Sequence, residues 1–172
     1  MVQWRVTLTT LAMHFEFTHL DATDAAVAHP LHALLQAAHA QEAALVGVAD
    51  LPALRRSVLD LQGANDDWLG AWAGERLVGA LALHADPDDE AVIAVGSLVT
   101  HPEHQRQGVA SLLLHAAVVS QGRRMPLSAQ VLEANAPALA LLRAAKFKPV
   151  RQWVELQGGQ RLRWVKLLRL PA

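Results

Sequence analysis

The chain has 172 residues, 52% of them apolar, and a formal net charge of −1 at pH 7, which suits one domain with a hydrophobic core. It contains no cysteine, so disulfides, thiolate metal sites and a cysteine nucleophile are excluded. No uncharged apolar run reaches about 18 residues, which argues against a membrane span, and no dense basic run indicates nucleic-acid binding. Without a secretory pattern at the N-terminus, we expect a cytoplasmic protein whose single domain covers 1–172, with 1–12 as an N-terminal extension.

Apolar periodicity predicts most of the secondary structure. In chain order it predicts a strand at 15–19, helices at 22–44 and 52–61, strands at 67–73, 76–84 and 91–100, a helix at 109–121, a strand at 126–132, a helix at 137–145 and strands at 150–156 and 161–168. Thr23 or Asp24 is expected to cap the first helix, and Pro30 to split or restart it. This order predicts an α/β (α+β) fold with a mixed, mostly antiparallel central sheet of about six to seven strands, flanked by about four helices.

The charges are distributed unevenly along the chain. Residues 1–100 hold four basic and 13 acidic residues, a net charge of −9, whereas 101–172 hold 11 and three, a net charge of +8. Either a basic half faces an anionic ligand and an acidic half attracts a cationic one, or the two halves interleave in space and their charges pair. Four of the carboxylates fall within 86–90, which is expected to be a loop.

The segment after the strand at 91–100 carries the clearest chemical signal. A turn containing Pro102 leads into Gln105–Ala110 and then into an apolar helix. The first N–H groups of a helix lack internal partners and favour an anion, and Gly108 lets an anion approach the backbone closely. Neither a Gly-Lys-Ser/Thr ending nor G-x-G-x-x-G is present, so the segment predicts a phosphate-binding loop outside those two classes.

Two motifs in this region resemble those of the GNAT superfamily of acyl-CoA-dependent N-acyltransferases. The Gln/Arg-x-x-Gly-x-Gly/Ala motif is matched by Gln105-Arg106-Gln107-Gly108-Val109-Ala110. The second motif is matched by Val131, Asn135, Ala138, Leu141-Leu142 and Lys146-Phe147, where Lys146 replaces the family's glycine. The resemblance covers roughly 91–147 and implies a GNAT fold, acetyl-CoA as cosubstrate and an amine acceptor, either a small molecule, a peptide terminus or a lysine.

The resemblance also implies which residues bind the cofactor. Loop N–H groups would hold the pyrophosphate, the backbone of 98–100 would pair with the pantetheine amides like an added strand, and Asn135 would both cap its helix and contact the pantetheine arm. The implied cofactor-binding residues are Leu98, Val99, Thr100, Gln105, Arg106, Gln107, Gly108, Val109, Ala110, Ser111 and Asn135.

The proton-transfer groups common in the family are not matched. Where many members carry a strand Glu, this chain has Ala94 and Gly96, and where many carry a Tyr it has Leu142; no tyrosine occurs at all. The base or acid would have to be a chain of waters or another side chain. The candidates are His101, Ser128, His84 and Glu90, with His101 otherwise a solvated turn residue.

The resemblance therefore implies an acyltransferase, an N-acetyltransferase that moves an acetyl group from acetyl-CoA directly to a primary amine. The alternatives are a GNAT-like acyl-CoA-binding module with little or no catalysis, acting as a sensor or partner-binding domain, and an unrelated α/β nucleotide binder. No metal is expected, because His29, His32 and His39 lack the spacing of a ligand set. The Trp- and Leu-rich last hairpin could form the edge of a homodimer.

Overall fold

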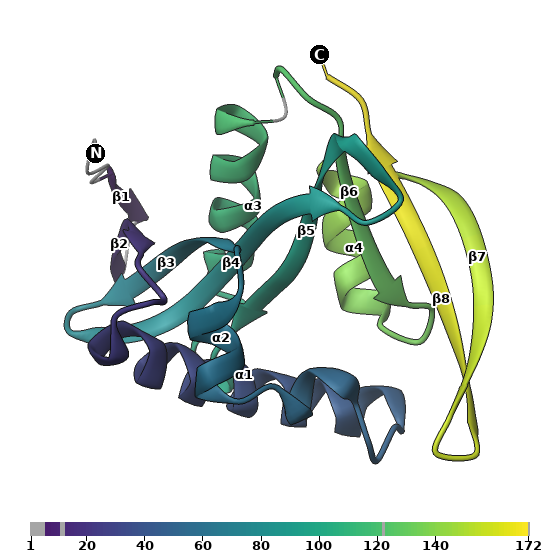
Figure 1. Ribbon diagram of the computed structural model, residues 1–172. Coiled ribbons are helices and arrows are strands. Elements are labelled where there is room, and N and C mark those ends of the chain that lie inside the picture. The colour runs from purple at the N-terminus through teal and green to yellow at the C-terminus, as the bar shows by residue number, and fades with distance from the viewer. Residues whose placement is uncertain (1–5, 11–12, 122, 172) are drawn as a thin grey trace.

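The computed structural model describes residues 6–10, 13–121 and 123–171 (Figure 1). The elements in chain order are β1 (Val6–Thr10), β2 (Met13–Leu20), α1 (Ala25–Val46), the 3₁₀ turn η1 (Pro52–Arg55), α2 (Val58–Gly63), β3 (Asp67–Ala73), β4 (Arg76–Asp86), β5 (Asp89–Thr100), the 3₁₀ turn η2 (Pro102–His104), α3 (Val109–Ser120), β6 (Leu127–Leu132), α4 (Ala136–Ala144), β7 (Lys148–Gln157) and β8 (Gln160–Arg169).

The strands of the described residues form one eight-stranded sheet in the order β1-β2-β3-β4-β5-β6-β8-β7. All neighbours pair antiparallel except β5 and β6, which are parallel. The predicted mixed, mostly antiparallel sheet with four α-helices is confirmed. The sheet has more strands than expected because residues 6–10, placed in an extension by the sequence analysis, form β1 and pair with β2.

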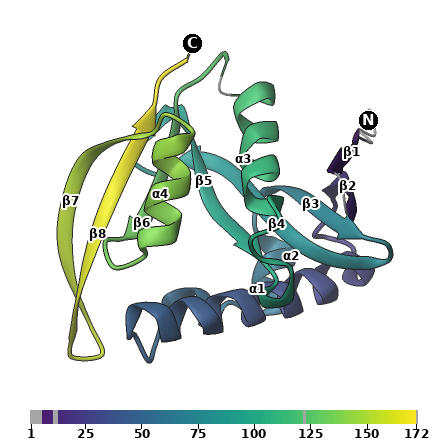
Figure 2. The same ribbon diagram turned by 180° about the vertical axis from the view of Figure 1, so that it is seen from behind.

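The helices cover both faces of the sheet, with α1 and α2 on one face and α3 and α4 on the other (Figures 1 and 2). Strand side chains alternate between the faces, so Leu81 of β4 packs with α3 and α4, whereas Ala80 and Ala82 pack against α1 and α2. Each face therefore has its own hydrophobic core. Among the described residues, no helix is long and apolar enough to cross a membrane.

Helix α1 runs unbroken through Pro30, which corrects the expected split. The Asp24 side chain caps its start, accepting a hydrogen bond from the Ala26 N–H at 2.9 Å. An interior proline costs about 3 kcal/mol, but Leu31 and Leu34 are 0% and 2% exposed, and each buried leucine returns about 1.5–3 kcal/mol. The free energy gained from packing these leucines therefore exceeds the cost of the interior proline.

The helix expected at 52–61 is divided into η1 and α2. Ser57 caps α2, because its hydroxyl accepts the Asp60 N–H while the Asp60 carboxylate accepts the Ser57 N–H, which forms a capping box. This reciprocal cap starts a new helix where the sequence analysis expected a continuous one.

The acidic segment 86–90 is a tight strand connection rather than a loop, since β4 ends at Asp86 and β5 begins at Asp89. Asp86 is 2% exposed, and Lys166 Nζ donates to its carboxylate at 2.8 Å and to that of Asp88 at 2.7 Å. Two acidic residues of the segment 1–100 thus pair with a basic residue of the segment 101–172. This cluster supports interleaving of the two charged halves, although Asp88, Asp89 and Glu90 remain exposed.

Helix α4 ends in a Schellman motif. The Phe147 N–H donates to Leu142 O and the Lys146 N–H to Arg143 O, both at 3.0 Å, and Phe147 and Leu142 pack in the same core. The motif requires a left-handed residue, and Lys146 takes it with φ = 71°. A glycine suits this position better, which explains the family's preference for one.

Candidate functional site

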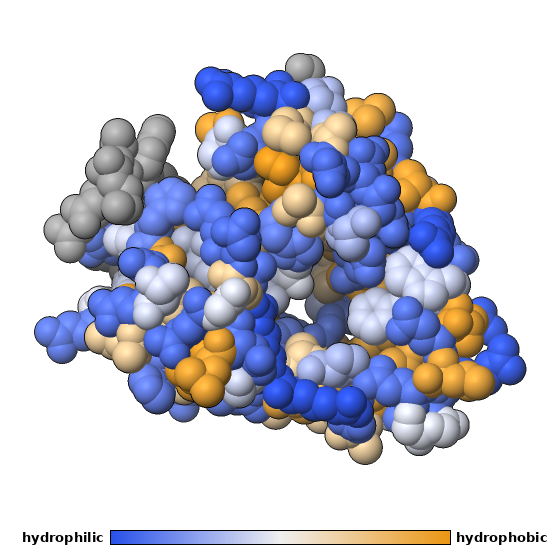
Figure 3. Space-filling model, viewed as in Figure 1, coloured by the Kyte–Doolittle hydropathy of each residue, from blue (hydrophilic) through white to orange (hydrophobic). Residues whose placement is uncertain are grey.

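A cleft of about 610 Å³ opens where β5 and β6 separate. The two strands pair over Ile93–Val95 and Leu127–Ala129, and the cleft lies beyond this pairing, lined by β5, β6, α1, the segment before α3 and the start of α4. Figure 3 shows a hollow in the surface at this place, above α1 and between β5 and α4. The parting of two parallel strands thus creates a concave site that several elements line.

Most residues expected to bind the cofactor lie around this cleft. The exception is Gln107, whose side chain instead reaches the backbone carbonyl of Glu103, at 3.5 Å. The predicted residues that line the cleft are Leu98, Val99, Thr100, Gln105, Arg106, Gly108, Val109, Ala110, Ser111 and Asn135. The fold therefore assembles in one place two segments that the sequence analysis treated as separate motifs.

The loop before α3 is shaped by two left-handed residues, Arg106 with φ = 60° and Gly108 with φ = 83°. Gly108 is the N-cap of α3 and supplies no side chain to cap it, and the first residues of the helix, Val109 to Ser111, line the cleft. Successive N–H groups in such a conformation form an anion-binding nest. Arg106 bears a backbone cost of about 1–2 kcal/mol, and strain of this kind is concentrated at functional sites.

Asn135 caps α4, as expected: its Oδ1 accepts the Ala138 N–H at 3.1 Å. Its Nδ2 donates across the cleft to Glu42 Oε1 of α1 at 2.8 Å. Burial raises the pKa of Glu42, but hydrogen bonds with His39 and Asn135 outweigh this effect and hold that pKa below its ordinary value. Glu42 is therefore an anion within the cleft wall.

Helix α1 also contributes to this site, which was not predicted from the sequence. His39, Gln41, Glu42 and Leu45 line the cleft, and Gln105 Nε2 donates to Gln41 Oε1 at 2.5 Å. A signal was present, because His39 and Glu42 are one helical turn apart in a helix otherwise rich in Ala and Leu.

His101, the first proton-transfer candidate, lies beside the cleft loop but not in the cleft lining. Its Nδ1 accepts the Glu103 N–H at 3.3 Å, and the Arg76 guanidinium is 3.0 Å from its Nε2 and 2.8 Å from Glu103 Oε2. Burial lowers the pKa of His101, and the positive charge of Arg76 lowers it further. The side chain thus stabilises the turn.

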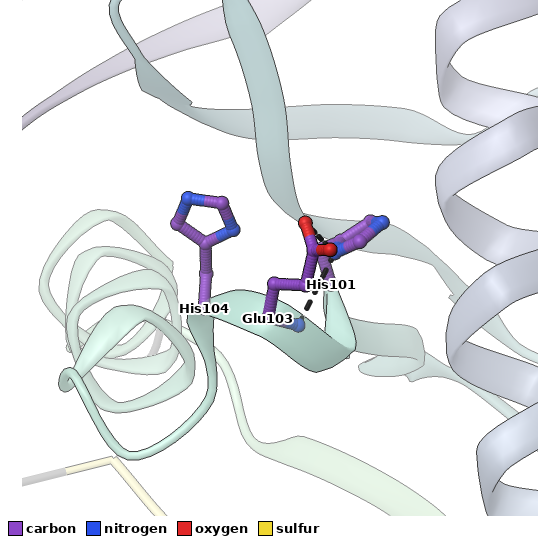
Figure 4. Close-up of side chains that lie close together, drawn as sticks. All are labelled: His101, Glu103 and His104. Carbon is purple, nitrogen blue, oxygen red and sulfur yellow. Dashed lines mark hydrogen bonds and ion pairs between the residues drawn. The ribbon is translucent and has the colours of Figure 1, made fainter.

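The same turn holds the one three-residue group of potential metal ligands found in the described residues. Ligand atoms of His101, Glu103 and His104 lie within 4.8 Å of one another. Figure 4 shows His101 and Glu103 side by side, with His104 standing apart. Because Arg76 contacts both His101 and Glu103, a guanidinium occupies the position of a bridging cation.

Ser128 and Glu90 also lie outside the cleft lining. Ser128 is 1% exposed and its hydroxyl donates to Asp86. Glu90 is exposed near the start of β5, and at about 3.3 Å per residue it lies roughly 20 Å along the strand from Gly96. None of the four candidates, all within the described residues, lines the cleft itself, but the ring of His84 lies against Gly96, which does.

Comparison with known proteins identifies relatives of this fold. The model of the "Acetyltransferase (GNAT) family" matches residues 28–147. An acetyltransferase structure from Thermus thermophilus is 23% identical, with a TM-score of 0.65 over 88% of this chain and 95% of that one. The ribosomal-protein-S18-alanine N-acetyltransferase of Escherichia coli is 17% identical, with a TM-score of 0.69 over 91% and 93%.

One further similar structure contains acetyl-CoA, and one further relative is longer than this chain. The structure of yncA, a putative acetyltransferase from Salmonella typhimurium with its cofactor acetyl-CoA, is 16% identical, with a TM-score of 0.65 over 90% of this chain and 92% of that one. UPF0157 protein YqkA of Bacillus subtilis is 24% identical over 139 residues, which are 81% of this chain. The chain spans 40% of that relative's length.

Proposed function

This chain belongs to the GNAT acetyltransferase family, and we propose that it transfers an acetyl group from acetyl-CoA directly to a primary amine. The observation that carries the proposal is the cleft between β5 and β6, with an anion-binding nest at one end. Its volume of about 610 Å³ lies within the range of about 300–1,000 Å³ typical of small-molecule sites. The Salmonella neighbour, which carries acetyl-CoA, supports the same donor.

The residues of the cleft fit the two polar parts of such a donor. The N–H groups that follow Gly108 suit a pyrophosphate, since they are oriented by the nest and by the start of α3. The backbone of Leu98–Thr100, beyond the paired part of β5, suits the amides of an extended pantetheine arm. Bound in this way, acetyl-CoA would supply the reactive thioester, and the chain would hold and orient it.

The residues of the chain support direct transfer without an acyl-enzyme thioester. The chain has no cysteine to take the acetyl group as a thioester, and Leu142 stands where a tyrosine would deliver a proton. Leu142 is 3% exposed and packs in the α3–α4 core. Rate enhancement would come mainly from holding amine and thioester together, an effect that can supply about 7–11 kcal/mol.

The acceptor is proposed as a class, an amine on a small molecule, a peptide terminus or a lysine. The Escherichia coli neighbour is named for alanine of ribosomal protein S18, which makes a peptide terminus the first candidate to test. Because α1 forms one wall of the cleft, the carboxylate of Glu42 would favour an acceptor that is cationic in solution.

The test combines binding with thiol release. Calorimetry with acetyl-CoA measures donor binding, and a thiol reagent then follows CoA release across a panel of small amines, lysine and N-terminal peptides; the cysteine-free chain adds no background. One thiol released per acetylated amine supports the proposal. Donor binding without release by any class of amine would instead indicate a binding module, and no donor binding would refute the cleft assignment.

A further inference from the structure

Strand β5 carries a bulge at the place where β5 and β6 separate. Opposite β4, Ala82 pairs with Ser97 and Leu83 with Val95, so Gly96 is an extra residue on β5. It comes directly after Val95, the last β5 residue paired with β6, and it lines the cleft. Bulges of this kind re-aim backbone and side-chain groups beside active sites.

The glycine at the bulge is required by space rather than by backbone conformation. Its φ is not in the left-handed region, but a Cβ atom on residue 96 would collide with the imidazole of His84, contacting Nε2 and lying 2.6 Å from Cδ2. The ring of His84, reaching across from β4, thus occupies the volume that a side chain at the bulge would fill. A half-buried imidazole therefore lies directly against a residue of the cleft wall.

A hydrogen bond on the other side of the ring determines which nitrogen is free. His84 Nδ1 lies 2.8 Å from the carbonyl oxygen of Ala85. A carbonyl can only accept, so Nδ1 carries the proton in the neutral ring, and Nε2 keeps its lone pair. The nitrogen able to take a proton is therefore the one beside Gly96, a residue of the cleft lining.

The distance along β5 suits a reacting centre at this place. Thr100, next to the anion-binding loop, lies four positions after Gly96, which corresponds to roughly 13 Å of extended strand. An extended pantetheine arm that starts at the loop and follows β5 would place its acetyl thioester near the bulge. The other candidates are engaged elsewhere, with Ser128 bonded to Asp86 and His101 held by the turn.

We propose that His84 is the proton acceptor of the transfer reaction, an inference that rests on the proposed function. The amine nitrogen forms the new C–N bond with the acetyl carbon, the C–S bond breaks with its electron pair on sulfur, and the proton shed by nitrogen passes to His84 Nε2. The thiolate then takes a proton from the imidazolium. The products are the amide and the CoA thiol, and the neutral ring is restored.

The first test is His84→Ala, with His115→Ala as its control because His115 is exposed on α3. General-base loss lowers kcat by about 100-fold or more, while acetyl-CoA affinity and the circular dichroism spectrum stay those of the parent. Millimolar imidazole restores part of the lost turnover, which a purely structural role would not allow. A folded variant with kcat within about threefold of the parent overturns the assignment.

Two further measurements test the contact between His84 and Gly96 and the tautomer of the ring. Gly96→Ala displaces the ring and lowers kcat in the parent, but it adds no loss in the His84→Ala background; additive losses would contradict the shared volume. Nitrogen-15 spectra of the imidazole report the tautomer without any turnover, and a ring protonated on Nε2 would overturn the proposal. Absence of transfer by the parent with every amine refutes the proposed function, whereas transfer that is indifferent to His84 refutes this inference alone.

Discussion

Replacing Lys166 with Met should destabilise the protein strongly, because it leaves a carboxylate buried without its cation. The side chains of Lys166 and Asp86 are 11% and 1% exposed, and the Lys166 ammonium joins β8 to the turn between β4 and β5 through bonds of 2.8 and 2.7 Å. Removing one member of a buried pair costs about 3–5 kcal/mol. We expect about 3 kcal/mol, the lower end of this range, because Ser128 and the Asp88 N–H still donate to Asp86.

The assay is urea unfolding followed by tryptophan fluorescence, which the five tryptophans make sensitive. A loss of about 3 kcal/mol corresponds to a fall in Tm of roughly 6–12 °C for a chain of this size. Lys148→Met, at an exposed position of β7, should stay within about 0.5 kcal/mol of the parent. The double variant Asp86→Asn with Lys166→Met should recover most of the loss, since no charge remains buried.

The same pair predicts a pH dependence with a definite sign. Burial raises the pKa of Asp86, but hydrogen bonds from Lys166, Ser128 and the Asp88 backbone outweigh it and hold the pKa below its ordinary value. A depressed carboxyl pKa stabilises the fold above the unfolded-state pKa, about 3.9, and the contribution is lost as pH falls through the folded value. The gap between parent and Lys166→Met should therefore narrow in acid. A loss under about 1 kcal/mol at pH 7, or a double variant no better than the single, would refute this reasoning.

Three other substitutions test the site and its supports. Gly108→Val places a side chain in the space beside the loop, at a φ of 83°, and calorimetry should show acetyl-CoA binding weakened by about tenfold or more, or about 1.4 kcal/mol. Gly63→Val, which lies outside the cleft, should leave this affinity unchanged, and a Gly108→Val variant that binds acetyl-CoA as tightly as the parent would contradict the loop assignment. Lys146→Gly relieves a left-handed residue and should raise Tm by about 2–4 °C, equivalent to about 1 kcal/mol; an unchanged or lower Tm would contradict that strain. Glu42→Gln keeps the hydrogen bond from Asn135 but removes a negative charge that repels the cofactor, so acetyl-CoA should bind about two- to fivefold tighter at low salt. Glu75→Gln in the exposed β3–β4 turn should not change the affinity. A Glu42→Gln variant with the affinity of the parent at every salt concentration would show that Glu42 does not repel acetyl-CoA.

The features that the sequence predicted well are those whose causes are local. The loop Gln105–Ala110 combines a strand end, a glycine and a helix start within a few residues, so its anion-binding shape can be inferred without the rest of the fold. The β3–β4 and β7–β8 hairpins were likewise confirmed, because turn residues and alternation act over short distances. Asn135 was predicted as a cap for the same reason.

The features that were missed or wrong depend on residues far apart in the chain. Pro30 did not break α1, because the cost of one proline was offset by packing against the sheet. The sequence showed 86–90 as acidic and polar, but its charges are partly neutralised by Lys166, 80 residues beyond Asp86.

The sequence by itself therefore determined the family, the alternation of strands and helices and the position of the anion-binding loop, since each is encoded in a short window. Only the tertiary structure determined which residues surround the cleft. Sheet register brings His84 against Gly96, and the packing of α1 joins Glu42 to Asn135, 93 residues away. Such pairings arise when segments far apart in the chain pack together around the hydrophobic cores, and no local propensity specifies them.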